Sequence, residues 1–383
     1  MDVSRGIAGP ARSPVVPHRS AGEARKPCAS IVVGSHNRLA HLCELLERFL
    51  AQDVADFEVI VIEQSTVSTA DQRRRLAELA RDPRIRIHPR PPLGGAGARN
   101  EGCRLARADI IVAFDDDDLP ASTRWLATLL RNFDDPRCLG VSGRHILENG
   151  PNPPYASMAK ARRRVLSYSP LMWQRCFPRS DVRSDRIQNL MGGNSAVRRS
   201  VLERCGLWDA FARCENENSL WFRLRRRIEP GEYLVFDPEA TMIRRLDVDG
   251  GMAKRKLGVF GFGWAMFEYF HKIIGYYHPA RFLALYPIYF GFYFWVICTW
   301  TWNESARYRG KHVRALATLA GFALAQPVSW TVWMARLAID RLRNGPAPRE
   351  TEFRPYPGGV APASISTSSS GEAIAAGDLT VAM

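Results

Sequence analysis

Between residues 28 and 135, the apolar positions of the chain alternate between two periods. Short apolar runs of strand length are separated by segments in which leucines recur at helical spacing. The runs expected to form strands are 31–33, 57–62, 85–87 and 109–114, and the expected helices lie at 39–50, 76–80 and 96–106. Strict alternation of strand and helix predicts βαβ units, and therefore an α/β fold with a mostly parallel sheet.

Polar residues directly follow three of these strands. Ser35, Asn37 and Arg38 stand after the first strand, Glu63 after the second, and the aspartates 115–118 after the fourth. Ligands of parallel α/β sheets bind beyond the carboxyl ends of the strands. We therefore expect these side chains to converge on one crevice.

The four consecutive aspartates 115–118 predict a cation site. Carboxylates a few ångströms apart repel and raise one another's pKa. Mg²⁺ or Mn²⁺ removes that cost and commonly bridges carboxylates to substrate phosphates. The alternative is a solvated acidic turn that caps the next helix, which the position after a buried apolar strand disfavours. A calcium loop of the EF-hand kind is disfavoured because Leu119 and Pro120 interrupt its pattern.

A series of sequence blocks resembles, in the same order, the motifs of family 2 glycosyltransferases. The blocks are SIVVGSHNR (30–38), FEVIVIE (57–63), ARNEG (98–102), FDDDDLP (114–120), GGNSAVRR (192–199), CGLWD (205–209) and ENSLWFR (217–223). The resemblance covers roughly residues 28–245. It implies a GT-A fold and an inverting, metal-dependent transferase that uses a nucleotide-sugar donor.

The resemblance also implies roles for individual residues. The positions matching the donor-binding motifs are Ser35, Asn37, Arg38, Glu63, Arg99, Asn100, Asp115 and Asp116. The expected metal ligands are Asp117 and Asp115, with Asp117 as the direct ligand. The positions matching the acceptor side are Gly193, Asn194 and Trp221. Glu63-Gln64 replaces the family's usual Asp-Asp, so the sequence leaves UDP, GDP and dTDP sugars open as donors.

The family's catalytic base is the Asp of a Glu-Asp pair shortly before a Leu-x-x-Arg motif. Counting back from Leu220 and Arg223 places Glu217 at that Asp, and Asn216 at the Glu. A Glu can remove a proton, although its side chain is longer by one C–C bond. Glu215 is the alternative base if the local register is shifted, and both acids could instead simply stabilise a helix N-terminus. The implied reaction is a single displacement in which the base deprotonates the attacking acceptor hydroxyl.

Composition adds a strong positive charge, with 53 Lys and Arg against 39 Asp and Glu. Such a balance suits nucleic acid, an anionic membrane or a phosphorylated substrate. The segment 160–186 concentrates this charge, and it suits a lipid-linked diphosphate or anionic headgroups. Nucleic acid is not expected as a partner, because no recognisable nucleic-acid module accompanies the charge. The eight cysteines include no C-x-x-C pair, which disfavours a zinc cluster and indicates reduced thiols.

The C-terminal third of the chain is apolar. Residues 282–302 carry no charge and are long enough to span a bilayer, and 316–335 form a second uncharged run interrupted by Gln326 and Pro327. A buried pair of core helices is the alternative. Spanning would place the basic loop 303–315 outside, against the positive-inside tendency, whereas a re-entrant or in-plane hairpin would not. We expect membrane attachment and leave the crossing open.

These observations predict a disordered tail over 1–27, a catalytic domain over 28–245, a membrane-associating helical region over 246–344 and a second disordered tail over 345–383. We expect the protein at the cytoplasmic face of the inner membrane. There it would transfer a sugar to a saccharide or lipid-linked acceptor during envelope polysaccharide synthesis. Two alternatives stay open: a phosphatase of the haloacid dehalogenase type with Asp115 as nucleophile, and a degenerate transferase fold acting as a membrane scaffold.

Overall fold

The structure is a computed structural model. It describes residues 26–148, 165–169, 174–176, 178–210, 216–245, 273–288, 291 and 352–360, together with single positions and pairs between 328 and 342. Most of the tail expected over 1–27, the alternative base Glu215 and much of the basic segment 160–186 lie outside these residues.

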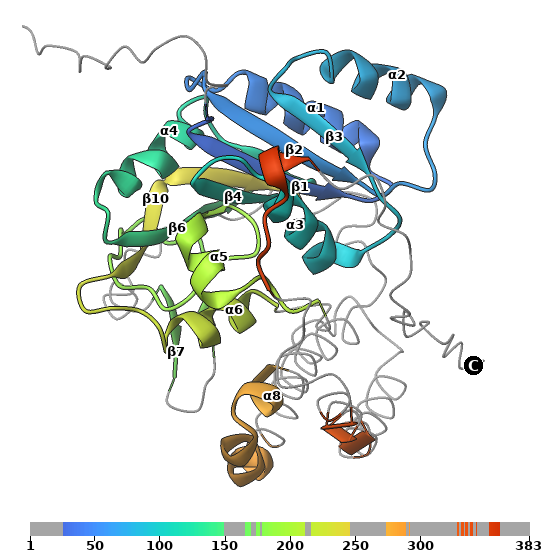
Figure 1. Ribbon diagram of the computed structural model, residues 1–383. Helices are drawn as coiled ribbons and strands as arrows, with labels where there is room; N and C mark the ends of the chain where they lie inside the picture. The colour runs from blue at the N-terminus through green and yellow to red at the C-terminus, as the bar shows by residue number, and fades with distance from the viewer. Residues whose placement is uncertain are drawn as a thin grey trace, which may run out of the picture.

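An eight-stranded mixed sheet forms the centre of the molecule (Figure 1). Its order is β3 (Ile85–Pro89), β2 (Phe57–Glu63), β1 (Ala29–Ser35), β4 (Ile110–Asp115), β9 (Ser195–Arg198), β6 (Cys138–Leu147), β10 (Tyr233–Arg244) and β5 (Asp118–Pro120). The first four strands are parallel, β9 runs antiparallel to both neighbours, and β10 is parallel to β6. A small second sheet pairs β7 (Leu166–Tyr168) with β8 (Gln174–Cys176). The predicted α/β class is confirmed, and the mixed sheet fits the expected GT-A fold.

Helices cover both faces of the main sheet, because alternate side chains of each strand point to opposite faces. On one face, Ile31 and Val33 of β1 share a core with α1 (Leu39–Leu50), α2 (Ala70–Leu79) and α4 (Trp125–Leu130). On the other face, Val32 shares a core with α3 (Gly94–Leu105), α5 (Arg199–Cys205) and α6 (Glu217–Leu224). A 3₁₀ turn, η1 (Arg131–Asp134), continues α4.

Local sequence explains two of these helices. The helix α2 begins earlier than the periodicity indicates, because Thr69 and Gln72 form a capping box in which each side chain accepts from the other's backbone N–H. The helix α3 packs very closely on β1. A Cβ at Gly102 would lie 2.2 Å from Cγ1 of Val32, so only glycine permits this approach. This close packing fixes the position of α3 relative to β1.

The core does not stop at residue 245. Ile273, Ile274 and Phe282 are buried in the same core as α5 and α6, and so is Phe353. A short helix, α8 (Gly275–Tyr277), and a 3₁₀ turn, η5 (Pro357–Gly359), belong to these later segments. The predicted disordered tail over 345–383 is therefore wrong for residues 352–360. Composition did not reveal this segment, because a high proline and glycine content is common both to disordered tails and to loops that tertiary contacts hold in place.

The membrane prediction concerns residues that are largely outside the description. Of the uncharged run 282–302 the structure describes 282–288 and 291, and of 316–335 it describes 328, 331, 332, 334 and 335. Within the part of the chain that is described, no helix combines the length and the apolar character needed to cross a bilayer. Among the cysteines in that part, Cys43, Cys103, Cys138 and Cys205 are buried free thiols, as expected.

Candidate functional site

The register of the parallel strands brings their polar ends to one edge of the sheet. Ser35, the last residue of β1, lies opposite Glu63, the last residue of β2. Gly34 lies opposite Asp115, the last residue of β4. The convergence expected from the sequence therefore follows directly from strand pairing.

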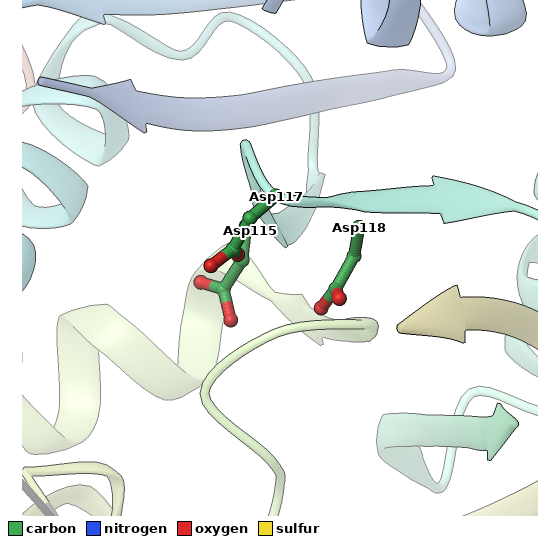
Figure 2. A group of neighbouring side chains, drawn as sticks. All are labelled: Asp115, Asp117 and Asp118. Atoms are coloured by element: carbon green, nitrogen blue, oxygen red, sulfur yellow. The ribbon is translucent and has the colours of Figure 1, made fainter. Parts of the chain in front are cut away.

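Three of the four aspartates form a compact group beyond β4. Carboxylate oxygens of Asp115, Asp117 and Asp118 all lie within 4.8 Å of one another. Figure 2 shows Asp115 and Asp117 pointing in the same direction, with Asp118 alongside at the start of β5. The expected pair Asp115 and Asp117 is thus brought together, and Asp118 is a third member that motif matching did not single out.

Two arginines partly neutralise this acidic group. Arg38 contacts Asp116 at 2.8 Å and Asp117 at 2.7 Å. Arg244, at the end of β10, lies 3.1 Å from Asp118 and 3.7 Å from Asp115. Burial raises the pKa of Asp116 to about 7, although Arg38 opposes the shift. Burial likewise raises the pKa of Asp118 to about 7 against the opposing effect of Arg244.

The residues present fit a divalent cation of the Mg²⁺ or Mn²⁺ type. All three grouped side chains offer hard carboxylate oxygens, which such ions prefer. Asp115 and Asp117 keep part of their surface exposed, at 37% and 22%, so an ion and a bound phosphate could reach them. The Oδ2 atom of Asp116 is buried without a hydrogen-bond partner, so Arg38 does not fully pair this carboxyl group.

The residues expected around the donor nucleoside hold two loops in position. Asn37 adopts a left-handed backbone conformation with φ of 56°, and its Oδ1 accepts from the backbone N–H of Thr66 at 2.8 Å. Glu63 is buried, and its Oε1 accepts from the N–H of Ser65 at 2.6 Å. Ser35 is buried beneath them. The structure brings these residues together, and their contacts with a donor stay predictions.

Arg99 and Asn100 are neighbours on α3 but point to different places. Arg99 reaches the acidic group, with Nη2 at 3.7 Å from Asp115, and it also stacks over the ring of Trp208. Asn100 is buried and bonds twice to the backbone of Trp208, through Nδ2 to the carbonyl at 2.7 Å and through Oδ1 from the N–H at 3.1 Å. In this structure Arg99 faces the aspartate group, whereas Asn100 holds the 205–209 loop.

Glu217 is the first residue of α6 and lies close to Arg99 and the Gly192–Gly193 loop. A Cβ placed on Gly192 would be 3.7 Å from Oε2 of Glu217 and 3.4 Å from Nη2 of Arg99, so the three residues meet there. Burial raises the pKa of Glu217, and the nearby charge of Asp115 adds to the shift while Arg99 and Arg244 oppose it. A carboxylate with a raised pKa is a stronger proton acceptor, as a general base requires.

Of the expected acceptor residues, Gly193 alone borders the aspartates. A Cβ on Gly193 would lie 2.6 Å from Oδ2 of Asp115, so the loop backbone presses directly against that carboxylate. Asn194 is fully buried. Its Oδ1 accepts from Nε1 of Trp125 at 2.7 Å, and its Nδ2 donates to the carbonyls of Arg144 and Ala240, both at 3.0 Å. Its side chain therefore supports the loop from the interior.

Trp221 is also largely buried, within the core formed by α5 and α6. An acceptor contact by Trp221 or Asn194 stays a prediction, and it would require either side chain to leave its present packing. The residue missed altogether is Arg244, which meets Asp118 across 126 positions of sequence. No local pattern around Arg244 carries that information, because it depends on β10 pairing with β5.

Comparisons with known proteins agree with the motif blocks that lie before residue 206. The sequence model described as "Glycosyl transferase family 2" matches residues 30–206. The chain is 35% identical over 89 residues to the "Uncharacterized glycosyltransferase YwdF" of Bacillus subtilis (strain 168). That match covers 23% of this chain and 32% of the relative, so the chain spans about a third of the length of the curated protein it matches.

Two solved structures are among those that align with this chain. The "Mannosyltransferase PcManGT from Pyrobaculum calidifontis in complex with GDP-Man and Mn2+" is 20% identical with a TM-score of 0.49, over 84% of this chain and 87% of that one. "S. aureus TarS 1-349 in complex with UDP-GlcNAc" is 14% identical with a TM-score of 0.46, over 64% of this chain and 66% of that one.

Proposed function

We propose that this chain transfers a sugar from a nucleotide-sugar donor to an acceptor hydroxyl with inversion. The match of the glycosyl transferase family 2 model to residues 30–206 supports this proposal. The observation that carries the proposal is the meeting of Asp115, Arg99 and Glu217 around the Gly192–Gly193 loop. An acid group that can hold a cation, a fixed guanidinium and a proton acceptor thus share one crevice at the strand ends.

The donor diphosphate binds, in this proposal, between the aspartate group and Arg99. Asp115, Asp117 and Asp118 would hold Mg²⁺ or Mn²⁺, which supplies positive charge against the developing charge of the leaving diphosphate. Arg99 stands at 3.7 Å from Asp115 and adds a cation that does not depend on the metal. Fixed charges of this kind stabilise a transition state because they need no reorganisation during the reaction.

Glu217 accepts the proton of the acceptor hydroxyl in this mechanism. Burial raises its pKa, so it binds a proton more readily than an exposed Glu does. The acceptor oxygen then attacks the anomeric carbon from the side opposite the diphosphate, which inverts the configuration. The loop Gly192–Gly193 separates Glu217 from Asp115, as the separation of base and leaving group requires.

We further propose that the protein acts at the cytoplasmic face of the inner membrane, on a saccharide or lipid-linked acceptor in envelope polysaccharide synthesis. The uncharged runs 282–302 and 316–335 support membrane attachment. So do the exposed apolar side chains of the described positions in this region, which are Leu283, Ile288, Val328, Val332, Ile339 and Leu342. Apolar surface of this kind is costly in water and is typical of membrane or partner contact.

The test uses the full chain in mild detergent with Mn²⁺ and a panel of UDP, GDP and dTDP sugars. A transferase releases nucleotide diphosphate from its own donor, and that nucleotide raises the melting temperature by mass action. Asp117→Ala is expected to abolish both responses. Asp109→Ala is the matched control, because Asp109 is 68% exposed and pairs only with Lys26 among its described ion pairs.

Three outcomes would contradict the proposal. Nucleotide release that is the same in Asp117→Ala and the parent would remove the metal assignment. Release of phosphate from a phosphomonoester, dependent on Asp115 and without any nucleotide sugar, would indicate a phosphatase. Failure of every donor to bind or to be hydrolysed would indicate a scaffold.

A further inference from the structure

The chain returns to the catalytic domain at its C-terminal side. Residues 352–360, here called the clasp, lie along α3 (Figure 1, red), and Gly359 near their end contacts Leu105 of α3 and Arg86 of β3. Phe353 is buried, and the guanidinium of Arg199 stacks over its ring at 5.6 Å. Arg245, where the chain leaves the domain, is itself tied to Glu44 at 2.6 Å. Described residues on both sides of the segment 246–351 therefore contact the domain.

The clasp is shaped for this position. Pro357 starts the turn η5, and Gly359 has φ of +72°, a conformation that favours glycine. A Cβ at Gly359 would lie 2.6 Å from the carbonyl oxygen of Leu105. Gly359 also accepts, through its own carbonyl, from Arg86, whose other nitrogen donates to the buried Glu58 at 2.7 Å. The positive φ, the close approach to Leu105 and the hydrogen bond from Arg86 all hold Gly359 in this position.

Tyr356 connects the clasp to α3 itself. Its backbone N–H donates to the carbonyl of Arg104 at 2.8 Å, and its hydroxyl donates to Oε2 of Glu101 at 3.0 Å. Glu101 is buried, and its other oxygen, Oε1, accepts from Nε of Arg90 at 3.0 Å and from Nη2 at 2.9 Å. Each carboxylate oxygen therefore has its own hydrogen-bond partner. The clasp supplies the one on Oε2, and Nη1 of Arg104 lies 4.0 Å from the same oxygen.

The same network continues to the donor side of the sheet. The backbone N–H of Arg90 donates to the carbonyl of Glu63, the residue at the end of β2. Glu101 directly follows Arg99 and Asn100 on α3, and these residues contact the acidic group and the Trp208 loop. A shift of α3 or of Arg90 would therefore move the groups that border the proposed donor pocket.

We propose that the clasp is an intramolecular docking segment that positions α3 for donor binding, with Tyr356 and Glu101 as positioning residues. They act through Arg90 and the α3 backbone, and they do not touch the donor. The reference to donor binding rests on the proposed function, whereas the docking and its effect on α3 do not. Loss of the clasp loosens α3 first and weakens nucleotide binding as a consequence.

The experiment compares full-length Tyr356→Phe and Gly359→Ala with the parent. Tyr356→Phe keeps the ring and removes only the hydroxyl group that donates a hydrogen bond to Glu101. Gly359→Ala places a Cβ against the carbonyl oxygen of Leu105. Tyr233→Phe is the matched control, because it also removes the hydroxyl of a half-buried tyrosine. That hydroxyl donates a hydrogen bond to the carboxylate of Asp135 at 3.0 Å. The readouts are hydrogen exchange of the amides of residues 97–105 and the Kd of the nucleotide diphosphate with Mn²⁺.

We expect faster hydrogen exchange in both clasp variants, confined to α3 and its neighbours. Tyr233→Phe should show no such change. A loss of about fivefold in nucleotide affinity should accompany the faster exchange in Tyr356→Phe, as for the loss of one ordinary hydrogen bond. Unchanged exchange over 97–105 would overturn the proposal. So would equally faster exchange throughout the domain, because the segment would then add only general stability. Faster exchange in α3 with unchanged nucleotide affinity would overturn the link to donor binding and keep the docking.

Discussion

Substitution of Gly193 by alanine should disturb Asp115 without touching any charged residue. The added Cβ would lie 2.6 Å from Oδ2 and 2.9 Å from Cγ of Asp115. Ordinary contact needs a separation nearer 3.4 Å, so the carboxylate must retreat by about 0.8 Å. Gly193 is not among the residues with positive φ, so the backbone itself accepts a side chain. The substitution is therefore expected to displace the carboxylate of Asp115 and to leave the backbone in place.

A displacement of this size matters at a cation site. Ligand distances in metal sites hold to within about 0.2 Å, so Asp115 would have to give up or distort its contact. We expect Mn²⁺-dependent nucleotide binding to weaken by about 10- to 100-fold, the range for disturbed support of a metal ligand. The melting temperature without metal should change little, because the substitution relieves no core contact and buries no polar group.

Titration calorimetry with nucleotide diphosphate, in the presence and absence of Mn²⁺, measures the effect. Gly192→Ala is the matched control, since its Cβ would lie 3.4 Å from Arg99 and 3.7 Å from Glu217, which is ordinary contact. Parent-like Mn²⁺-dependent binding by Gly193→Ala would refute the placement of Asp115 at the cation site. Equal losses in both variants would assign the effect to loop stiffness instead.

Three further predictions follow from the described residues. Glu217→Gln should keep nucleotide affinity and lose about 10²- to 10⁴-fold in sugar transfer, and normal transfer would show that another group takes the proton. Asn194→Ala should lower the free energy of unfolding by about 3 kcal/mol, because Trp125 and two carbonyls lose their partner; a stable variant with altered acceptor KM would contradict this interior role. Burial lowers the pKa of His278 from 6.5 to about 4, and the positive charge of Arg225 adds to the shift. Between pH 6.5 and 4 the unfolded chain therefore binds a proton at His278 that the folded chain does not, so stability should fall as the pH drops through this range. His278→Gln should flatten that part of a melting-temperature profile against pH, and an unchanged slope would assign the acid loss to other groups.

The sequence by itself determined the parts of this protein that depend on neighbouring residues. The periods of 2 and 3.6 in apolar positions marked the parallel strands and their helices, because the backbone of each element sets which side chains face the core. The same pattern placed Glu63 and Asp115 at the strand ends, and strand register then brought them to one edge. The motif blocks pointed to Glu217, which lies near Arg99 at the Gly192–Gly193 loop.

Tertiary structure decided what depends on residues far apart in the chain. Asn100 and Asn194 stand in motif blocks, yet packing turns both inward, to Trp208 and to Trp125. Arg244 reaches Asp118 because β10 pairs with β5, a pairing that no local pattern encodes. The clasp 352–360 has the composition of a loop, and contacts with Glu101 and Arg86 hold it on α3. Local periodicity reports which face of an element is buried, whereas the partner on that face is chosen only when the whole chain packs.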